Sequence, residues 1–218
     1  MYTELWISFL TSFALALVFT PVAMYIAPKI GAVDIPDDGR RMHTKAMPRF
    51  GGMAIYIGTT VSMIMYLSFD PRIVVLIVCG TFMYILGVID DLKNLPPMVK
   101  FAGQIAIACA VYYNGIRIEF ITNFFGGGLS HFGNVVCFIV TILWIVGITN
   151  TVNLIDGLDG LAAGTAAIAS LSIAYVAYIH GMYLASCSML AVSGGALGFL
   201  PFNFYSAKIF MGAGGSLF

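Results

Sequence analysis

The stretch from residue 150 to residue 164 carries side chains whose types and spacing suit the binding of a charged ligand. Its amides and carboxylates recur at intervals of three, as Asn150, Asn153, Asp156 and Asp159. In a regular helix, residues three apart lie side by side. Gly157 and Gly160 favour a turn or a broken helix, because glycine is costly in a helix interior. Placed at a membrane boundary, these polar groups predict a polar substrate, a metal ion or both.

A second acidic feature is the pair Asp90 and Asp91, at the end of an apolar run. Adjacent carboxylates repel one another and lose solvation unless a cation neutralises them. Oxygen ligands of this kind suit magnesium, which also binds phosphates. Helix capping or a solvated boundary pair is the alternative. Pro96 and Pro97 should begin the next helix, and Lys100 could reach back towards a phosphate.

The segment from residue 33 to residue 52 collects basic residues just before Gly51 and Gly52. Arginine and lysine ahead of a helix N-terminus predict an anion site. A loop that is basic only because it is cytoplasmic is the alternative interpretation. His43 taken alone fits a loop histidine better than a ligand or a base.

The composition sets the class of protein. Hydrophobic residues make up 60% of the chain and charged residues 9%, with a mean hydropathy of +0.97. Soluble domains have about a quarter of their residues charged. We therefore expect an all-α integral membrane protein forming a single multispanning domain over residues 1–218. The formal net charge of zero gives no indication of a nucleic-acid partner.

Apolar runs predict about seven transmembrane helices, each near the roughly 20 residues that cross a bilayer. They cover residues 5–27, 51–69, 72–89, 98–114, 135–150, 161–179 and 182–200. Between the fourth and the fifth, residues 115–134 alternate in polarity and then carry three glycines. This pattern predicts a small extracytoplasmic β-hairpin.

The lysines and arginines predict the orientation, because cytoplasmic loops are enriched in them. Only Arg72 and Arg117 fall on one side, which places the N-terminus outside. The other side has eight basic residues: Lys29, Arg40, Arg41, Lys45, Arg49, Lys93, Lys100 and Lys208. Most acidic residues fall on that same side, which topology does not explain. We expect the chemistry there, on the cytoplasmic face.

Basic residues, an Asp-Asp pair and an Asn/Asp/Gly loop on one membrane face meet the needs of phosphoryl transfer. Such a reaction needs Mg²⁺ on a diphosphate, a lysine or arginine to steady charge, and a carboxylate to accept a proton. No large soluble domain is evident, so we expect one substrate to arrive from the bilayer.

Four stretches carry a family resemblance: VDIPDDGRRMHTKAMPRFGG, VIDDLKNLPPMVKFAGQ, NTVNLIDGLDGLAAG and AKIFMG. They resemble the polyprenyl-phosphate N-acetylhexosamine-1-phosphate transferases. The resemblance implies transfer of a sugar 1-phosphate from a UDP-N-acetylhexosamine to undecaprenyl phosphate, with release of UMP. It implies Mg²⁺, with Mn²⁺ as an alternative ion. The aromatic and methionine-rich spans fit lipid-facing packing better than a cofactor site, so we expect no organic cofactor. The resemblance also implies a multi-pass protein of the bacterial cell membrane and leaves a homodimer open.

The resemblance assigns catalytic and metal-binding residues position by position. Asp90 and Asp91 correspond to the essential acidic pair, one of which is a candidate base for the lipid phosphate. Asp156 corresponds to a catalytic residue at the metal–diphosphate. Asn153 corresponds to the family's magnesium-ligating asparagine.

The resemblance likewise assigns substrate-binding residues. Lys100 resembles a phosphate contact, and Asn150 resembles a contact to the diphosphate or the nucleotide. Asp159 belongs to the same group. His43 and Arg49 belong to the first-loop signature.

The chain departs from the family pattern in two ways. Where the family has Phe-Met-Gly-Asp-x-Gly-Ser, this chain has Ala213 in place of the aspartate. That aspartate is the family's second magnesium ligand, so we expect impaired metal binding and turnover. Family members also usually have ten or eleven helices, so we expect a C-terminally truncated form or a fragment.

The pattern Pro48-Arg49-Phe50-Gly51-Gly52 resembles the GlcNAc-1-phosphate branch, which starts teichoic acids, O-antigens and related glycans. The phospho-MurNAc-pentapeptide transferase of peptidoglycan synthesis is the alternative within the family. A cation-coupled membrane transporter is the alternative from another class, although its acidic residues should lie near the midplane. A membrane scaffold without substrate is a further alternative.

Overall fold

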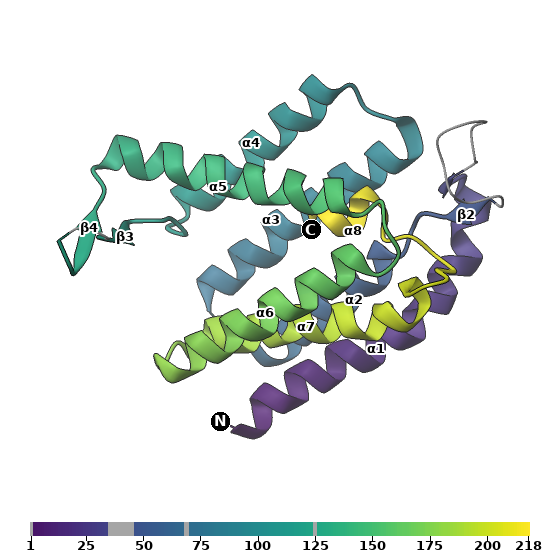
Figure 1. The fold of residues 1–218 in the computed structure, drawn as a ribbon, viewed down its shortest axis with the longest axis horizontal. Coiled ribbons are helices and arrows are strands. Elements are labelled where there is room, and N and C mark those ends of the chain that lie inside the picture. The colour runs from purple at the N-terminus through teal and green to yellow at the C-terminus, as the bar shows by residue number, and fades with distance from the viewer. Residues whose placement is uncertain (1, 35–45, 68–69, 124–125) are drawn as a thin grey trace.

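The computed structural model describes residues 2–34, 46–67, 70–123 and 126–218 (Figure 1). Within these residues the chain is mainly helical. Its helices are α1 (Tyr2–Ile30), α2 (Gly52–Leu67), α3 (Pro71–Lys93), α4 (Pro97–Tyr113), α5 (Asn134–Ile155), α6 (Leu161–Ile179), α7 (Tyr183–Asn203) and α8 (Gly212–Leu217). Its strands are β1 (Val33–Asp34), β2 (Met47–Pro48), β3 (Phe120–Thr122) and β4 (Leu129–His131).

The helices form two groups with the short α8 between them (Figure 1). In one group, α7 packs against α1, α2 and α6. In the other, α4 packs against both α3 and α5. Helix α8 contacts α2, α3 and α5, and so connects the two groups. The C-terminal six-residue helix is therefore central to the packing, although it is too short to cross a membrane.

The predicted all-α membrane class is confirmed. The seven predicted spans correspond to α1 through α7. Among the described residues, five helices are long and apolar enough to cross a bilayer: α1, α3, α5, α6 and α7. Helix α2 is apolar with 16 residues, and α4 has 17 residues with Lys100 in its first turns.

Several helices extend further than the apolar runs predicted, and the extensions of α3 and α5 carry predicted site residues. Helix α3 continues through Asp90 and Asp91 to Lys93, and Asn94 ends it in a left-handed conformation (φ 47°) with its N–H bonded to the Asp90 carbonyl. Helix α5 continues to Ile155, so Asn153 is helical. Polar side chains can remain helical here because neighbouring segments supply their hydrogen-bond partners.

The predicted hairpin between the fourth and fifth helices is confirmed. Strands β3 and β4 pair antiparallel, with Phe120 opposite His131 and Thr122 opposite Leu129. A second antiparallel pair, β1 with β2, was not predicted and places Val33 opposite Pro48. The two pairs lie at opposite ends of the molecule (Figure 1). The β1–β2 end is also where α3, α5 and α7 end, so the polar loops share it.

Glycines allow α8 to lie close to its neighbours. A Cβ at Gly87 of α3 would meet the Ala213 carbonyl and, at 2.6 Å, the Gly214 nitrogen. A Cβ at Gly52 of α2 would meet the backbone of Gly215. Small residues permit this kind of backbone approach between membrane helices. The position of α8 therefore depends on glycine at two contact points.

This packing predicts different effects of alanine at two glycines that both lie inside helices. We expect Gly87→Ala to lower the free energy of unfolding by about 1–3 kcal/mol, because α8 must move. Gly147 of α5 is the control, since a Cβ there would meet nothing within 4 Å. Gly147→Ala should leave stability unchanged or raise it by up to about 1 kcal/mol. Unfolding by SDS in mixed micelles, followed by circular dichroism, measures both, and equal midpoints would contradict the prediction.

Candidate active site

The carboxylate of Asp91 joins α3 to α8. One of its oxygens accepts the N–H of Ala213 at 2.9 Å, and the other accepts the N–H of Gly214 at 3.0 Å. The guanidinium of Arg49 lies 3.4 Å from the same carboxylate. The Asp91 side chain is 2% exposed, so these donors replace water as its partners. Asp91 therefore has a structural role that its place in the acidic pair did not predict.

Lys100 brings Asp90 and Asn153 together. Its ammonium donates to Asp90 Oδ2 at 2.8 Å and to Asn153 Oδ1 at 2.9 Å. The second carboxylate oxygen of Asp90 accepts the N–H of Leu95 at 3.1 Å. The side chains of Lys100 and Asp90 are 15% and 17% exposed. The Asp90 carboxylate of α3 and the Asn153 amide oxygen of α5 thus share the Lys100 ammonium at the edge of solvent.

Asp156 follows the end of α5 and accepts the N–H of Gly212 at 3.0 Å. Burial raises the pKa of Asp156 from its ordinary value of 3.8 to about 7. The charge of Arg49 and the Gly212 hydrogen bond oppose that rise in pKa, and the charge of Asp91 adds to it. The carboxyl can therefore exchange a proton near neutral pH, as a general acid or base must.

The first-loop signature lies against the segment that leads into α8. The N–H of Gly51 donates to the Phe210 carbonyl at 3.0 Å, and that of Gly52 donates to the Met211 carbonyl at 2.7 Å. The N–H of Phe210 in turn donates to the Pro48 carbonyl at 2.8 Å. This backbone pairing places Arg49 beside Asp91.

Asn150 links α5 to α4. Its amide donates to Gln104 Oε1 at 2.6 Å and accepts from Gln104 Nε2 at 3.5 Å. The amide nitrogen of Asn150 also donates to the Val146 carbonyl of its own helix at 2.8 Å. Its contacts in this structure are therefore structural ones.

The turn after α5 is tied to the segment after α7. Asp159 accepts the N–H of Ala207 at 3.0 Å. Asn203 accepts the N–H of Gly160 and donates to the Ile209 carbonyl. These bonds hold two polar loops against one another.

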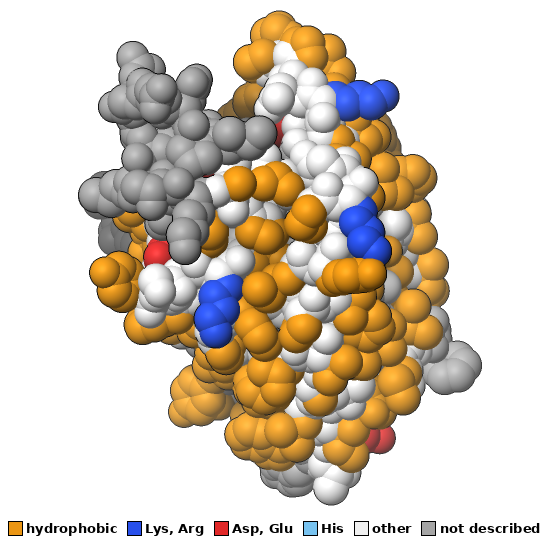
Figure 2. Space-filling view, turned by 90° about the vertical axis from the view of Figure 1, so that its right-hand side faces the viewer, with side chains coloured by type: hydrophobic (Ala, Val, Ile, Leu, Met, Phe, Trp, Pro, Cys, Tyr) orange, Lys and Arg blue, Asp and Glu red, His pale blue; other side chains and the backbone are white. Residues whose placement is uncertain are grey.

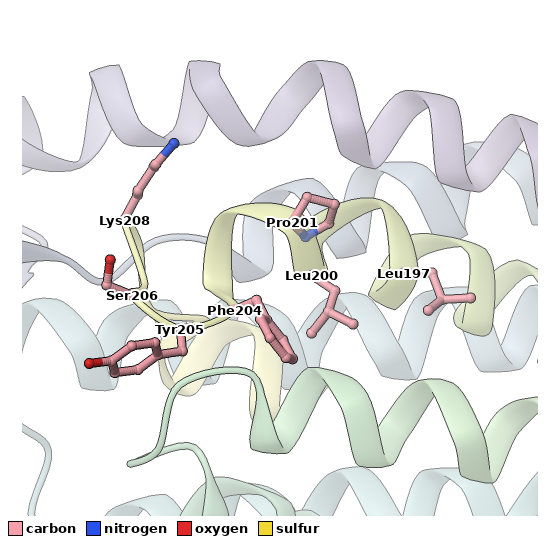
Figure 3. Close-up of a pocket in the computed structure, with 7 residues that line it drawn as sticks. All are labelled: Leu197, Leu200, Pro201, Phe204, Tyr205, Ser206 and Lys208. Carbon is pink, nitrogen blue, oxygen red and sulfur yellow. The ribbon is translucent and has the colours of Figure 1, made fainter.

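The surface of this end is mixed in character. In Figure 2, lysine and arginine side chains stand singly among apolar ones, and acidic side chains show only small areas. A groove of about 510 Å³ beside the end of α7 is lined by apolar residues such as Leu200 and Phe204, with Lys208 at one side (Figure 3). Of the predicted site residues that the structure describes, none lines this groove. The acidic residues and the groove are therefore separate features.

The oxygen donors at this end meet part of what Mg²⁺ needs. Within the described ranges, no three His, Cys, Asp or Glu residues gather as a metal-binding group. The methyl group of Ala213 offers no ligand, and its N–H is bonded to Asp91. Asn153 and Asp90 nevertheless present oxygens to one shared cation, and oxygen is the ligand that Mg²⁺ prefers. These two oxygens suit a Mg²⁺ ion chemically, and such an ion would take the place that the Lys100 ammonium holds in this structure.

Comparison with known proteins identifies the family. Residues 73–218 match the model described as "Glycosyl transferase family 4". The "Phospho-N-acetylmuramoyl-pentapeptide-transferase" of Shouchella clausii is 34% identical over an alignment 224 positions long, which covers 94% of this chain and 69% of that protein. The chain belongs to glycosyl transferase family 4. The family resemblance predicted from the motifs is thus confirmed.

Two further relatives of this family 4 chain carry N-acetylglucosamine names. The "Probable undecaprenyl-phosphate N-acetylglucosaminyl 1-phosphate transferase" of Bacillus subtilis is 42% identical over 213 residues, covering 97% of this chain and 59% of that protein. The "Decaprenyl-phosphate N-acetylglucosaminephosphotransferase" of Mycolicibacterium smegmatis is 32% identical, with 88% and 52% coverage. The family 4 chain thus spans between half and three fifths of the length of these relatives.

The structure gathers most of the predicted residues at one end of the family 4 bundle and leaves others apart. Arg49 contacts Asp91, and Lys100 contacts both Asp90 and Asn153. The two sets meet at the adjacent residues Asp90 and Asp91 of α3. Asp156 is hydrogen-bonded to α8, whereas Asn150 and Asp159 bind neighbouring helices and loops. His43 lies outside the described residues.

Three residues with site contacts were not predicted from the sequence: Gln104, Asn203 and Ser216. Gln104 has no exposed surface and is a lone amide in an apolar helix, which is a signal that the sequence does offer. Asn203 and Ser216 are 2% and 4% exposed and lie near or within motif segments. Each also has a partner distant in sequence, Gly160 for Asn203 and Asn153 for Ser216, which only the fold reveals.

The raised pKa of Asp156 predicts a pH dependence of stability in metal-free buffer. Between about pH 4 and pH 7 the unfolded carboxyl has lost its proton while the folded one keeps it. Folding therefore binds a proton in this window, so the free energy of unfolding falls as pH rises and then levels off. Asp156→Asn should flatten the curve, with a difference of about 1–3 kcal/mol across the window. Unfolding midpoints measured from about pH 4 to pH 8 test this, and parallel curves would count against it.

The Gln104–Asn150 pair predicts non-additive effects on stability. Gln104→Leu should cost about 0.5–2 kcal/mol, because it leaves the Asn150 amide without its partner. The double variant Gln104→Leu with Asn150→Leu should recover most of that loss, since neither side then buries an unpaired polar group. SDS unfolding of the parent, both single variants and the double variant gives the cycle. Additive losses would show that the two amides do not interact.

Proposed function

We propose that this chain forms part of a Mg²⁺-dependent transferase for N-acetylhexosamine 1-phosphate. The donor is a UDP-N-acetylhexosamine, with UDP-GlcNAc as the expected substrate, and the acceptor is undecaprenyl phosphate. The main support is the meeting of Arg49, Asp90, Asp91, Lys100 and Asn153 at one end of an apolar bundle. The printed names of the Bacillus subtilis and Mycolicibacterium smegmatis relatives agree with this substrate class.

The proposed reaction exchanges one phosphoanhydride bond for another. A phosphate oxygen of undecaprenyl phosphate forms a bond to the β-phosphorus of the UDP-sugar. The bond between that phosphorus and the oxygen bridging to the α-phosphate breaks, and UMP leaves with the bridging oxygen. The products are UMP and the sugar linked to the lipid by a diphosphate. Such a step depends mainly on positioning and on neutralising phosphate charge.

The geometry suggests different roles for the two adjacent acids. Asp91 is buried and bonded through both oxygens to α8, so it suits holding that helix in place. Asp90 lies at the edge of solvent on Lys100, so it is the better candidate to accept a proton from the lipid phosphate. Lys100 and Arg49 would steady negative charge on the phosphates. Asp156 can also hold or release a proton near neutral pH.

Mg²⁺, or Mn²⁺ in its place, would be held by the carbonyl oxygen of Asn153. When bound, such an ion would supply positive charge to the diphosphate and so ease the departure of UMP. Ala213 removes an anionic ligand, so we expect weaker metal binding and slower turnover in this chain than in a form with aspartate there.

We also propose that this end of the bundle faces the cytoplasm and that the N-terminus lies outside, in a bacterial cell membrane. The support is the distribution of lysine and arginine along the sequence. The lipid acceptor would then reach the site from the bilayer. A homodimer stays a prediction.

The alternatives differ in substrate or in class. The phospho-MurNAc-pentapeptide transferase activity has support from the Shouchella clausii relative at 34% identity, below the 42% of the Bacillus subtilis protein. A cation-coupled transporter fits less well, because the acids lie at helix ends and not midway along the spans.

Restoring the aspartate should increase activity. We expect Ala213→Asp to raise Mg²⁺-dependent UMP release from UDP-GlcNAc and undecaprenyl phosphate by roughly ten- to a hundredfold, because it returns an anionic ligand. The assay should use this chain and also a chimera that continues after Phe218 with the rest of the Bacillus subtilis relative. Chelation by EDTA should abolish release, and added Mg²⁺ should restore it.

The controls decide between the alternatives. Asp90→Asn in the Ala213→Asp form should remove activity without unfolding the protein. UMP release only from UDP-MurNAc-pentapeptide would favour the peptidoglycan enzyme. No release from either donor by a folded chimera would contradict the proposed function, as would equal activity with and without the Ala213→Asp substitution.

A further inference from the structure

Ser216 connects α8 to the predicted metal ligand. This residue is 4% exposed. The hydroxyl donates to the Gly212 carbonyl at 3.1 Å and accepts from Asn153 Nδ2 at 2.8 Å. Because its one proton goes to Gly212, the hydroxyl oxygen can only accept from the Asn153 amide. Ser216 therefore fixes the Asn153 amide with its NH₂ group facing the hydroxyl.

The oxygen end of the same amide has a hydrogen-bond partner of its own. Asn153 Oδ1 accepts the ammonium of Lys100 at 2.9 Å, and a lysine ammonium can only donate. The amide is thus held by a donor at its oxygen and by an acceptor at its nitrogen. This orientation matters for a metal ligand, because the carbonyl oxygen can bind a cation whereas the NH₂ group repels it.

The helix that carries Ser216 is itself held firmly. Asp91 accepts the N–H groups of Ala213 and Gly214, and Asp156 accepts that of Gly212. Gly215 lies so close to Gly52 that a side chain would not fit between them. Ser216 follows these contacts within the same short helix. Its hydroxyl is therefore a fixed acceptor for the Asn153 amide.

We propose that Ser216 is a positioning residue that keeps the Asn153 carbonyl oxygen turned towards the cation. This inference rests on the proposed role of Asn153 as a Mg²⁺ ligand. A metal ion on the carbonyl oxygen would take the place of the Lys100 ammonium, so Ser216 would then be the hydrogen-bond partner that fixes the amide. Without the hydroxyl, the amide could rotate and present its NH₂ group to the metal. Hydrogen-bond partners that orient metal ligands contribute substantially to metal affinity.

A direct test is Mn²⁺ binding to the purified chain in nanodiscs, measured as the loss of the free-Mn²⁺ EPR signal. We expect Ser216→Ala to weaken Mn²⁺ binding about tenfold. The matched control is Ser170→Ala in α6. Ser170 is also 4% exposed and bonds a carbonyl of its own helix, but no side-chain partner is found among the described residues. Ser170→Ala should change Mn²⁺ affinity less than about twofold.

A double-mutant cycle separates orientation from general support of the fold. Asn153→Asp places oxygen at both ends of the ligand, so its orientation no longer matters. Ser216→Ala should then cost less than about twofold in Mn²⁺ affinity in the Asn153→Asp background. An equal loss in both backgrounds would overturn the proposal, because Ser216 would then act only on the fold. Equal losses of Mn²⁺ affinity in Ser216→Ala and Ser170→Ala would also overturn the proposal.

The same series is repeated in the Ala213→Asp form, where binding should be tighter. Absence of Mn²⁺ binding in both forms would overturn the proposal, since Asn153 would not act as a metal ligand. UMP release by the Ala213→Asp chimera is measured separately. Activity there with no effect of Ser216→Ala on Mn²⁺ affinity would reject the positioning role while leaving the proposed function intact.

Discussion

The site depends on one buried charge, the carboxylate of Asp91. A carboxylate that is 2% exposed must be matched by donors, or its loss of hydration would favour unfolding. The matching donors are the first N–H groups of α8 and the guanidinium of Arg49. One acid in α3 therefore holds the first-loop signature and the C-terminal motif in place, although these are far apart in the sequence.

The membrane setting explains why the polar groups gather at one end. Within a bilayer, backbone groups must be satisfied inside each helix, so irregular chain and charged side chains lie at helix ends. Here α3, α5 and α7 end where β1 and β2 pair (Figure 1). The loops at that end satisfy one another through Asp156, Asp159 and Asn203. A network of this kind can hold side chains rigidly enough for phosphate chemistry.

Ala213 illustrates how the fold and the chemistry can be separated. The contact between residue 213 and Asp91 uses the backbone N–H, which any residue except proline provides. Alanine therefore preserves the docking of α8 while it removes a carboxylate from the family motif. An aspartate there would add a third acid beside Asp91 and Asp156, and like charges so close need a cation. Alanine at position 213 thus keeps the backbone contact to Asp91 without placing a further carboxylate beside it.

The sequence alone determined the membrane class, the helices, the hairpin and the family. These follow from local signals. About 20 consecutive apolar residues predict a span, and a motif is recognised from residue types and spacing along the chain, without knowing which residues touch. It also predicted that Asp90, Asp91, Asn153 and Asp156 belong to one site. It did not predict that α3 and α5 would extend through the acidic and amide residues. The helices were predicted from apolar runs, and an apolar run stops at the first polar residues.

Only the tertiary structure decided how the site residues divide their work. Asp90 and Asp91 are neighbours in sequence, yet one lies at the edge of solvent on Lys100 and the other is buried against α8. Asn150 and Asn153 are one turn apart, yet the first binds Gln104 and the second binds Lys100 and Ser216. The physical reason is that a hydrogen bond depends on which distant group the packing brings within about 3 Å, and sequence spacing does not determine that distance.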